Sequence, residues 1–280
     1  MLSLIFALLA ASPAHPPPLV IGTYRYPRYD RAVALAPLAE LAEKETGRPT
    51  QILLLDTPSA LAEAVCHGEV HIAMTNLGSF VQMQDCPKVE AVAVLDTPAE
   101  ILDRYRGVLL ATNTAGVDSL ATLTERGVTL RYSEVLPGST SGALVQAEAL
   151  RGVGITAAEF QTRRMAGTHE AALEDLLAGR SDLAALAEEP WRKLQADDPA
   201  RASTIRQIWR SEPLPPGPVV CVQAKNLTCR AVQRALLKKS ATGAAIALAA
   251  GWSETEGAMR FKRYRPVDYK AFVRTRSANR

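Results

Sequence analysis

The chain has 280 residues, of which 48% are hydrophobic and 22% are charged. This composition is typical of a globular protein and excludes wholesale disorder, and the length admits two lobes or one large domain. The formal net charge of +3 is too small, and the Lys and Arg residues are too dispersed, to favour nucleic acid as a partner.

The N-terminal residues form a short apolar run that ends at Ser12-Pro13-Ala14. Such a run is too short to cross a bilayer comfortably, and the small residues Ser12 and Ala14 suit a signal peptidase. We therefore predict a signal peptide at 1–14, cleaved near Ala14, and an exported protein. The alternative, a short buried helix, is disfavoured because Pro13 and the prolines at 16–18 would end it.

A strand, an aromatic loop and a helix follow. Residues 19–23 have the apolar and β-branched content of a buried strand, and 32–45 carry apolar residues at helical spacing. The loop between them contains Tyr24, Tyr26 and Tyr29, and it lies at the C-terminal end of the strand, where open α/β sheets bind ligands. We predict that Tyr24 and Tyr26 line a cleft, with surface packing as the alternative for each.

The alternation of strand and helix then continues. We predict strands at 51–55, 71–74, 89–94 and 105–113, and helices at 58–67 and 118–123. Asn76 lies in a turn that leads into a further helix start, and Tyr105 lies where the chain leaves this first group of elements. We include both among the candidate ligand-binding residues.

The most informative stretch has the sequence PGSTSGALVQ and occupies 137–146. It follows a predicted strand at 128–132 and leads into a predicted helix at 143–150. Its first half is therefore a tight turn at a helix start, where the glycines allow close approach of the backbone.

A helix start offers up to four N–H groups without intrahelical partners and the positive end of the helix dipole. The hydroxyls of Ser139, Thr140 and Ser141 add further donors, and this combination suits a small oxyanion. The turn contains no Lys, which argues against a nucleotide P-loop. The alternative is that Ser139 or Thr140 only caps the helix.

A second turn with a similar arrangement follows later in the chain. After a predicted strand at 160–165, the turn from Gly167 leads through His169 into a helix that ends at Gly179, and a strand at 182–186 comes next. His169 at this helix start is a further candidate donor.

The last part of the chain returns to the first group of elements. Residues 213–218 are proline-rich and extended, and 219–222 form a predicted strand. Two helices are predicted at 229–240 and 242–250. The chain thus crosses twice between two groups of elements, which indicates a hinge made of two strands.

Four cysteines remain in the exported chain, at Cys66, Cys86, Cys221 and Cys229. An even number favours disulfides, with three connectivities possible. We prefer Cys66–Cys86 and Cys221–Cys229, because each pair closes a local loop within one predicted lobe. The spacings lack a CxxC pair, so a zinc site is not expected.

Taken together, the PGSTSG turn and the Gly-Thr-His-Glu turn at 167–170 resemble the periplasmic substrate-binding proteins of phosphate, phosphite and phosphonate ABC transporters. The likeness extends to Gly68–Ala73, where His71 replaces the usual Asp, and to 208–219. It implies a type II periplasmic-binding-protein fold of two α/β lobes with a two-strand hinge. We assign 15–108 and 218–280 to the first lobe, and 109–217 to the second.

In that family an S-T-S-G helix start holds the phosphonyl oxygens, and a G-G-H-[DE] turn supplies a further donor. The resemblance therefore implies that the ligand is bound by Ser139, Thr140, Ser141, Gly142 and His169. It also implies a small-molecule solute, an ABC permease as partner, a periplasmic location and binding without chemical conversion. We expect a monomer with no cofactor and no metal.

Two segments depart from the family pattern, and a third keeps it. Phe80 stands where a tyrosine is common, and Gly217-Pro218 replaces a segment that holds an acidic residue, while Glu189 is a counterpart of a second acidic residue. We therefore expect a less polar cleft in which an aminoalkyl phosphonate is disfavoured. A bulky apolar molecule, such as a lipid or sterol, is the alternative ligand.

A serine hydrolase is a remote alternative. Ser139 or Ser141 with His169 and a carboxylate of Glu170 or Glu189 has the residue types of a catalytic triad. The turn nevertheless lacks the G-x-S-x-G pattern of a nucleophile elbow, which disfavours hydrolysis.

Overall fold

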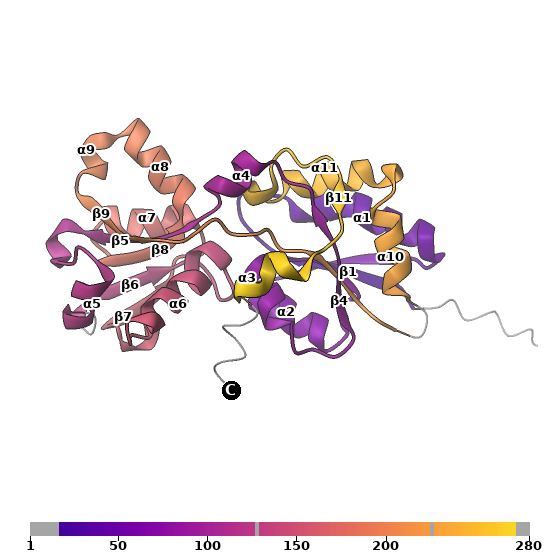
Figure 1. Cartoon of the computed structure of the whole chain (residues 1–280), viewed down its shortest axis with the longest axis horizontal. Coiled ribbons are helices and arrows are strands. Elements are labelled where there is room, and N and C mark those ends of the chain that lie inside the picture. The colour runs from indigo at the N-terminus through magenta and orange to yellow at the C-terminus, as the bar shows by residue number, and fades with distance from the viewer. Residues whose placement is uncertain (1–16, 127–128, 225–226, 273–280) are drawn as a thin grey trace, which may run out of the picture.

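The structure is a computed structural model that describes residues 17–126, 129–224 and 227–272. The predicted signal peptide at 1–14 lies outside the described residues. Figure 1 shows two α/β lobes side by side, connected by two crossing segments of chain. We call the lobe with the six-stranded sheet lobe 1 and the lobe with the five-stranded sheet lobe 2.

The sheet of lobe 1 combines strands from both ends of the chain, in the order β11-β4-β10-β3-β1-β2. Its strands are β1 (Leu19–Tyr24), β2 (Thr50–Leu55), β3 (Ile72–Met74), β4 (Val89–Leu95), β10 (Val219–Val222) and β11 (Phe261–Lys262). Strand β1 runs parallel to β2 and β3, whereas β10 runs antiparallel to β3 and β4. The returning strand β10 thus lies inside the sheet.

Helices cover both faces of this sheet, which explains why its strands are nearly continuous apolar runs. The helices are α1 (Arg31–Thr46), α2 (Pro58–Cys66), α3 (Leu77–Gln82), α4 (Ala99–Arg104), α10 (Cys229–Leu236) and α11 (Thr242–Ala250). Helices α1, α10 and α11 contribute to the hydrophobic core on one face, and α2 and α3 contribute to the core on the other.

Lobe 2 repeats this arrangement with a five-stranded sheet in the order β7-β6-β8-β5-β9. Its strands are β5 (Gly107–Thr112), β6 (Arg131–Glu134), β7 (Thr162–Met165), β8 (Leu183–Ala187) and β9 (Ile205–Arg210). Its helices are α5 (Leu120–Arg126), α6 (Val145–Gly152), α7 (His169–Leu177), α8 (Glu188–Asp197) and α9 (Pro199–Ala202). Helices α5 and α6 pack on one face, and α7, α8 and α9 on the other.

The chain passes between the lobes through α4 and again through 211–218 (Figure 1). The two segments are bonded together, since the Leu214 N–H donates to the Tyr105 carbonyl at 2.9 Å. The Tyr269 hydroxyl donates to the Pro216 carbonyl at 2.7 Å, so the C-terminal segment holds the second crossing. Strand β5 of lobe 2 begins at Gly107, close to the predicted lobe boundary between residues 108 and 109. The exact boundaries of the lobes stay a prediction.

Most predicted elements are present, with shifted ends. The strand predicted at 128–132 is β6, which begins only at Arg131; residues 127 and 128 lie outside the described part of the chain. Helices α4 and α8 and strand β9 were not predicted. Helix α8 has the sequence EEPWRKLQAD, which contains few apolar residues, and only three of its residues are buried. Its sequence therefore gives little periodic signal for a helix.

Both predicted disulfides are confirmed. Cys66 at the end of α2 is bonded to Cys86, and Cys221 in β10 is bonded to Cys229 at the start of α10, with Cα–Cα distances of 5.4 and 5.6 Å. These distances lie in the usual range for a disulfide. Both crosslinks belong to lobe 1.

Membrane-spanning helices and clusters of metal ligands are both absent from the described residues. No helix among them has both the length and the apolar character needed to cross a bilayer. No group of three or more His, Cys, Asp or Glu side chains in that part of the chain is placed to hold a metal ion.

Gly217 lies where two backbones approach closely. A Cβ atom on Gly217 would lie 2.2 Å from the Thr75 carbonyl oxygen and 2.5 Å from the Asn76 Cα atom. These atoms belong to the turn between β3 and α3, so they cannot swing aside as a flexible side chain can. The position therefore has no room for the acidic residue of the resembled family.

We predict that Gly217→Ala destabilises the protein by about 1–3 kcal/mol, the usual cost of overpacking a filled site. Gly243→Ala is the matched control, because a Cβ at this exposed position in α11 meets nothing within 4 Å. We expect the control to be neutral or to gain up to about 1 kcal/mol from helix propensity. Urea denaturation measures both, and equal stability of Gly217→Ala and the wild type would contradict the packing argument.

Candidate functional site

A cavity of about 440 Å³ lies between the lobes. Its walls come from the end of β1, the crossing segment at α4, the PGSTSG turn, the start of α7 and the segment that follows α11. Nine of the ten predicted ligand-binding residues line it: Tyr24, Tyr26, Asn76, Tyr105, Ser139, Thr140, Ser141, His169 and Glu189. Gly142 is the exception. The structure thus brings residues far apart in the sequence around one space.

The PGSTSG turn opens α6 through a wider, π-helical turn at Thr140–Leu144. The Leu144 N–H donates to the Ser139 carbonyl at 2.9 Å, five residues back. Such turns interrupt α-helices mostly at functional sites. Within the described residues, the N–H groups from Thr140 to Ala143 have no acceptor. Four donors therefore remain available at the start of the helix.

The hydroxyls of this turn do not cap the helix. Ser139 occupies the cap position, but its side chain accepts no backbone N–H of the helix. The Thr140 hydroxyl accepts from the Gly78 N–H of lobe 1 at 2.9 Å. The alternative that these residues serve only as caps is wrong, because the one hydroxyl that accepts a backbone N–H bonds the opposite lobe.

Gln146 holds this helix start in place. Its buried side-chain nitrogen lies 2.7 Å from the Ser141 carbonyl, 3.1 Å from the Val108 carbonyl of β5 and 3.2 Å from the Leu186 carbonyl of β8. The side chain thus ties the turn to two central strands. The sequence alone assigns no role to Gln146, because two of its three hydrogen-bond partners, Val108 and Leu186, lie in distant segments of the chain.

His169 begins α7 as a neutral side chain. Its Nδ1 accepts a hydrogen bond from the Ala187 N–H at 2.9 Å, which leaves the proton on Nε2. Burial lowers the pKa of His169 to about 4; the neighbouring Glu170 carboxylate opposes this change, and the Arg28 charge adds to it. The ring therefore offers a single uncharged donor, Nε2–H, from a cavity wall.

Gly142 packs the two helix starts together instead of lining the cavity. A Cβ atom at Gly142 would lie 2.4 Å from the Val135 Cγ2 atom and 2.9 Å from the His169 Cε1 atom. No side chain fits between the PGSTSG turn and the histidine ring. The predicted contact of Gly142 with a ligand is therefore limited to its backbone N–H.

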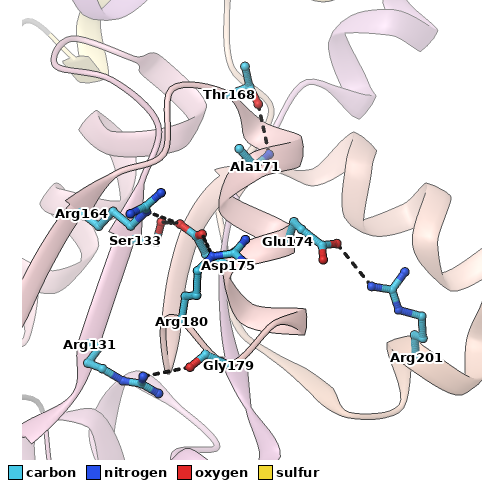
Figure 2. Close-up of polar contacts among 10 residues, drawn as sticks. All are labelled: Arg131, Ser133, Arg164, Thr168, Ala171, Glu174, Asp175, Gly179, Arg180 and Arg201. Atoms are coloured by element: carbon cyan, nitrogen blue, oxygen red, sulfur yellow. Dashed lines mark hydrogen bonds and ion pairs between the residues drawn. The ribbon is translucent and has the colours of Figure 1, made fainter.

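The helix that carries His169 is anchored by Asp175 (Figure 2). The Asp175 carboxylate, 2% exposed, accepts from the Ser133 hydroxyl at 2.8 Å, from Arg180 Nε at 2.7 Å and from Arg164 Nε at 3.0 Å. Burial pushes the pKa of Asp175 upward, but the bonds from Arg180 and Ser133 outweigh it and hold the pKa below its usual value. Helix α7 is thus fixed to β6 and β7.

Several contacts join the two lobes beside the cavity. The Asn76 side-chain amide donates to the Gly138 carbonyl at 3.0 Å, and the His169 N–H donates to the Tyr26 hydroxyl at 3.3 Å. Arg28 of lobe 1 also forms an ion pair with Glu170 at the start of α7. The lobes therefore hold the cavity between them on more than one side.

Tyr105 adds a hydroxyl from the crossing segment. Burial raises the pKa of Tyr105 well above its usual value, the nearby Glu254 charge raises it further, and hydrogen bonding with Thr140 and Ser141 opposes the rise. The hydroxyls of Tyr105, Thr140 and Ser141 therefore gather at one place in the cavity.

The cavity is more highly charged than the sequence led us to expect. Phe80 does not line it but packs edge-on against the rings of Tyr264 and Tyr269, each 5.5 Å away, in the core of lobe 1. Phe80 therefore gives no support to the expectation of a cleft less polar than that of the family, which stays a prediction. Four arginines and four glutamates line the cavity: Arg28, Arg31, Arg104, Arg106, Glu170, Glu189, Glu254 and Glu256.

A family model described as ABC transporter, phosphonate, periplasmic substrate-binding protein matches residues 26–272. The chain belongs to this family. The resemblance inferred from the PGSTSG and Gly-Thr-His-Glu turns is therefore confirmed. No curated protein matches the chain significantly.

Solved structures share the fold at low identity. PhnD1 from Prochlorococcus marinus, in complex with methylphosphonate, gives a TM-score of 0.64 at 16% identity and covers 92% of this chain and 98% of its own. A binding-protein component of an ABC phosphonate transporter from Pseudomonas aeruginosa gives 0.64 at 19% identity, with 94% and 89% covered. A Xanthomonas citri protein bound to ATP gives 0.70 at 17% identity, with 94% and 99% covered. These likenesses establish the type II fold.

As a member of this phosphonate-binding family, the protein is a periplasmic solute-binding component of an ABC transporter. The family implies a small-molecule solute and a membrane permease as partners. Membership in the family does not by itself identify the solute that this chain binds.

We predict that His169 makes the free energy of unfolding fall as the pH is lowered from about 6.5 to about 4. The folded pKa of about 4 lies below the ordinary value of 6.5, so the unfolded chain binds a proton in this window and the folded chain does not. Between pH 6.5 and pH 4, the free energy of unfolding should therefore fall by up to about 3 kcal/mol less in His169→Asn than in the wild type.

The exposed residue His67 provides the control, since His67→Asn should leave the pH profile of wild-type stability unchanged. Denaturation curves between pH 4 and 7.5 give the comparison. A His169→Asn profile parallel to that of the wild type would show that the imidazole is not buried as described.

We predict that Asp175→Asn destabilises the protein by about 1–3 kcal/mol near neutral pH, because two arginines and a serine lose their charged acceptor. The pKa of Asp175 is lowered on folding, so the lost stabilisation is present above about pH 4 and vanishes as the pH falls through the folded value.

Glu174→Gln is the neighbouring control. Its ion pair with Arg201, at 3.3 Å, joins two half-exposed side chains (Figure 2), so the change should stay within about 0.5 kcal/mol. Urea denaturation measures the free energy of unfolding of both variants. An equal loss of stability in Asp175→Asn and Glu174→Gln would contradict the anchoring role of Asp175.

Proposed function

We propose that the protein binds a phosphorus oxyanion, either phosphite or a phosphonate with phosphate as a competitor, in the cavity between its lobes. The observation that carries this proposal is the start of α6. There, four backbone N–H groups have no acceptor among the described residues, and the three hydroxyl residues beside them line the cavity. Preorganised donors at a helix start are the usual way in which proteins hold such anions.

Each predicted residue then has a defined part. Ser139, Ser141 and the N–H groups of the turn donate to the oxyanion, and His169 Nε2–H and the Tyr105 hydroxyl donate from neighbouring walls. Thr140 and Asn76 bond the opposite lobe and hold the cleft closed. We assign Tyr24, Tyr26 and Glu189 to the walls that surround the rest of the ligand.

The charges around the cavity favour this ligand over a lipid or sterol. Four arginines and four glutamates line the space and give it no net formal charge. An apolar molecule would cut these side chains off from water without offering them hydrogen bonds, which is costly. Neutral donors at a helix start, in contrast, bind an anionic acceptor more strongly than a neutral one.

The histidine geometry supports binding over hydrolysis. In a catalytic triad, the histidine Nδ1–H donates to a carboxylate. Here Nδ1 is itself the acceptor of the Ala187 N–H, so it cannot orient His169 for proton transfer in that way. We therefore propose a binding protein without catalytic activity, which closes its lobes on the solute and delivers it to a permease.

We further propose that the protein is exported as a monomer through a signal peptide at 1–14, cleaved near Ala14. The two disulfides support this location, because disulfides persist in oxidising compartments such as the periplasm.

We predict that Ser139→Ala and Ser141→Ala each weaken oxyanion binding by about 1–3 kcal/mol, the contribution of a hydrogen bond to a charged group. Titration calorimetry measures the affinity of the wild type and of each variant for phosphite, methylphosphonate, phosphate and a long-chain fatty acid. Ser203→Ala, on the exposed surface of lobe 2, should bind like the wild type. Heat from the fatty acid alone, or unchanged affinity in both variants, would overturn the proposal.

A further inference from the structure

The cavity is larger than an inorganic oxyanion requires. Its volume of about 440 Å³ falls within the range of sites for drug-sized ligands. A water molecule takes about 30 Å³ in the liquid, so a group of three or four oxygens around phosphorus fills only part of this space. The walls formed by segments other than the PGSTSG turn are therefore available to another part of the solute.

Arg31 forms one of these walls and is held rigidly. Its guanidinium carbon lies 4.2 Å from the ring centre of Tyr24 and 4.3 Å from that of Trp252, and the side chain is buried. Its Nε donates to the Gly251 carbonyl at 3.1 Å and its Nη1 donates to the Tyr24 carbonyl at 3.2 Å. Among the described residues, no carboxylate lies within 4.0 Å of its nitrogens. A guanidinium has five N–H groups, so donors remain for a ligand.

Trp252 contributes a second unused donor. The side chain lines the cavity, and its buried indole N–H has no partner of normal hydrogen-bond geometry within the described part of the chain, although it lies close enough to the Tyr24 hydroxyl to oppose the rise of the Tyr24 pKa. A buried N–H without an acceptor is costly in a folded protein. An acceptor on the solute would remove this cost.

Glu254 supplies an acceptor beside these donors. It lies two residues after Trp252, is partly buried and lines the same cavity. Burial raises the pKa of Glu254, and the charge of Arg31 opposes that rise. They nevertheless stay farther apart than an ion pair. Both groups are therefore free to bind a third.

A hydroxyl group suits this arrangement better than a charged group does. It can accept from Arg31 or Trp252 and at the same time donate to Glu254. A carboxylate on the solute would face the charge of Glu254, and an ammonium group would face Arg31. The rings of Tyr24 and Trp252 offer flat apolar surface to the carbon atoms that carry the hydroxyls.

We propose that Arg31, Trp252 and Glu254 form a second subsite that binds hydroxyl groups on the organic part of the solute. The solute class is then a hydroxylated alkylphosphonate or the corresponding phosphate ester. This inference rests on the proposed function, because the phosphorus oxyanion is held at the PGSTSG turn.

The test compares propylphosphonate with 2,3-dihydroxypropylphosphonate, two compounds that differ only in their hydroxyls. By titration calorimetry, the wild type should bind the dihydroxy compound at least tenfold more tightly, because a site built for hydroxyls discriminates against analogues without them. Trp252→Phe keeps the ring and removes the N–H, and Glu254→Gln removes the charge of the acceptor. Each change should reduce the preference at least threefold. Trp252→Phe should leave propylphosphonate affinity within about twofold, whereas Glu254→Gln should strengthen propylphosphonate binding, because the carboxylate that it removes lines the same cavity and repels the anion.

Ser139→Ala separates this inference from the proposed function. It should weaken both compounds by the same factor and keep the preference. If both bind equally well to the wild type, or if Trp252→Phe and Glu254→Gln weaken both equally, the second subsite is wrong and the oxyanion site stands. If 3-phosphonopropionate or 2-aminoethylphosphonate binds more tightly than the dihydroxy compound, the assignment to hydroxyls is also wrong. If no phosphonate, phosphite or phosphate binds, the proposed function fails and this inference fails with it.

Discussion

The donors at the start of α6 depend on the packing of one buried amide. Gln146 lies among the carbonyls of Ser141, Val108 and Leu186, and these belong to the turn and to two strands of lobe 2. The amide thereby stabilises a π-helical turn in which the N–H groups from Thr140 to Ala143 have no acceptor among the described residues. Unpaired donors are costly in a folded protein, so the surrounding packing has to maintain them. The oxyanion site is thus a property of lobe 2 as a whole, since its sheet positions the turn.

The same sheet positions the histidine. Strand β6 leads into the PGSTSG turn and strand β7 leads into α7, so both helix starts lie at one edge of a parallel pair. Asp175 fixes α7 to this pair, and Gly142 lets the two helix starts pack without a side chain between them. The uncharged state of His169 follows from this packing, because burial disfavours the imidazolium.

The sequence predicts the fold and the part of the cavity wall that carries the hydroxyl and histidine donors, because both follow from local patterns. Alternating strands and helices indicate the two lobes, and the S-T-S-G and Gly-Thr-His-Glu turns identify residues at strand ends that one edge brings together. Arg31 and Glu254 escape such reasoning, since they meet only after the C-terminal segment folds back on α1. The packing of Phe80 and the lack of room at Gly217 are likewise consequences of tertiary contacts, which no local pattern encodes.

The two lobes are reinforced by different chemistry. Both disulfides lie in lobe 1, whereas lobe 2 contains no cysteine and pairs its buried carboxylates with arginines, as in Asp175 with Arg180 and Glu188 with Arg210. A reductant therefore weakens lobe 1, and acid weakens lobe 2 through Asp175, whose pKa is held below its usual value. Lobe 1 shares part of this acid sensitivity, because Arg260 and Lys262 lower the pKa of Asp96, so only the effect of a reductant is confined to one half of the molecule.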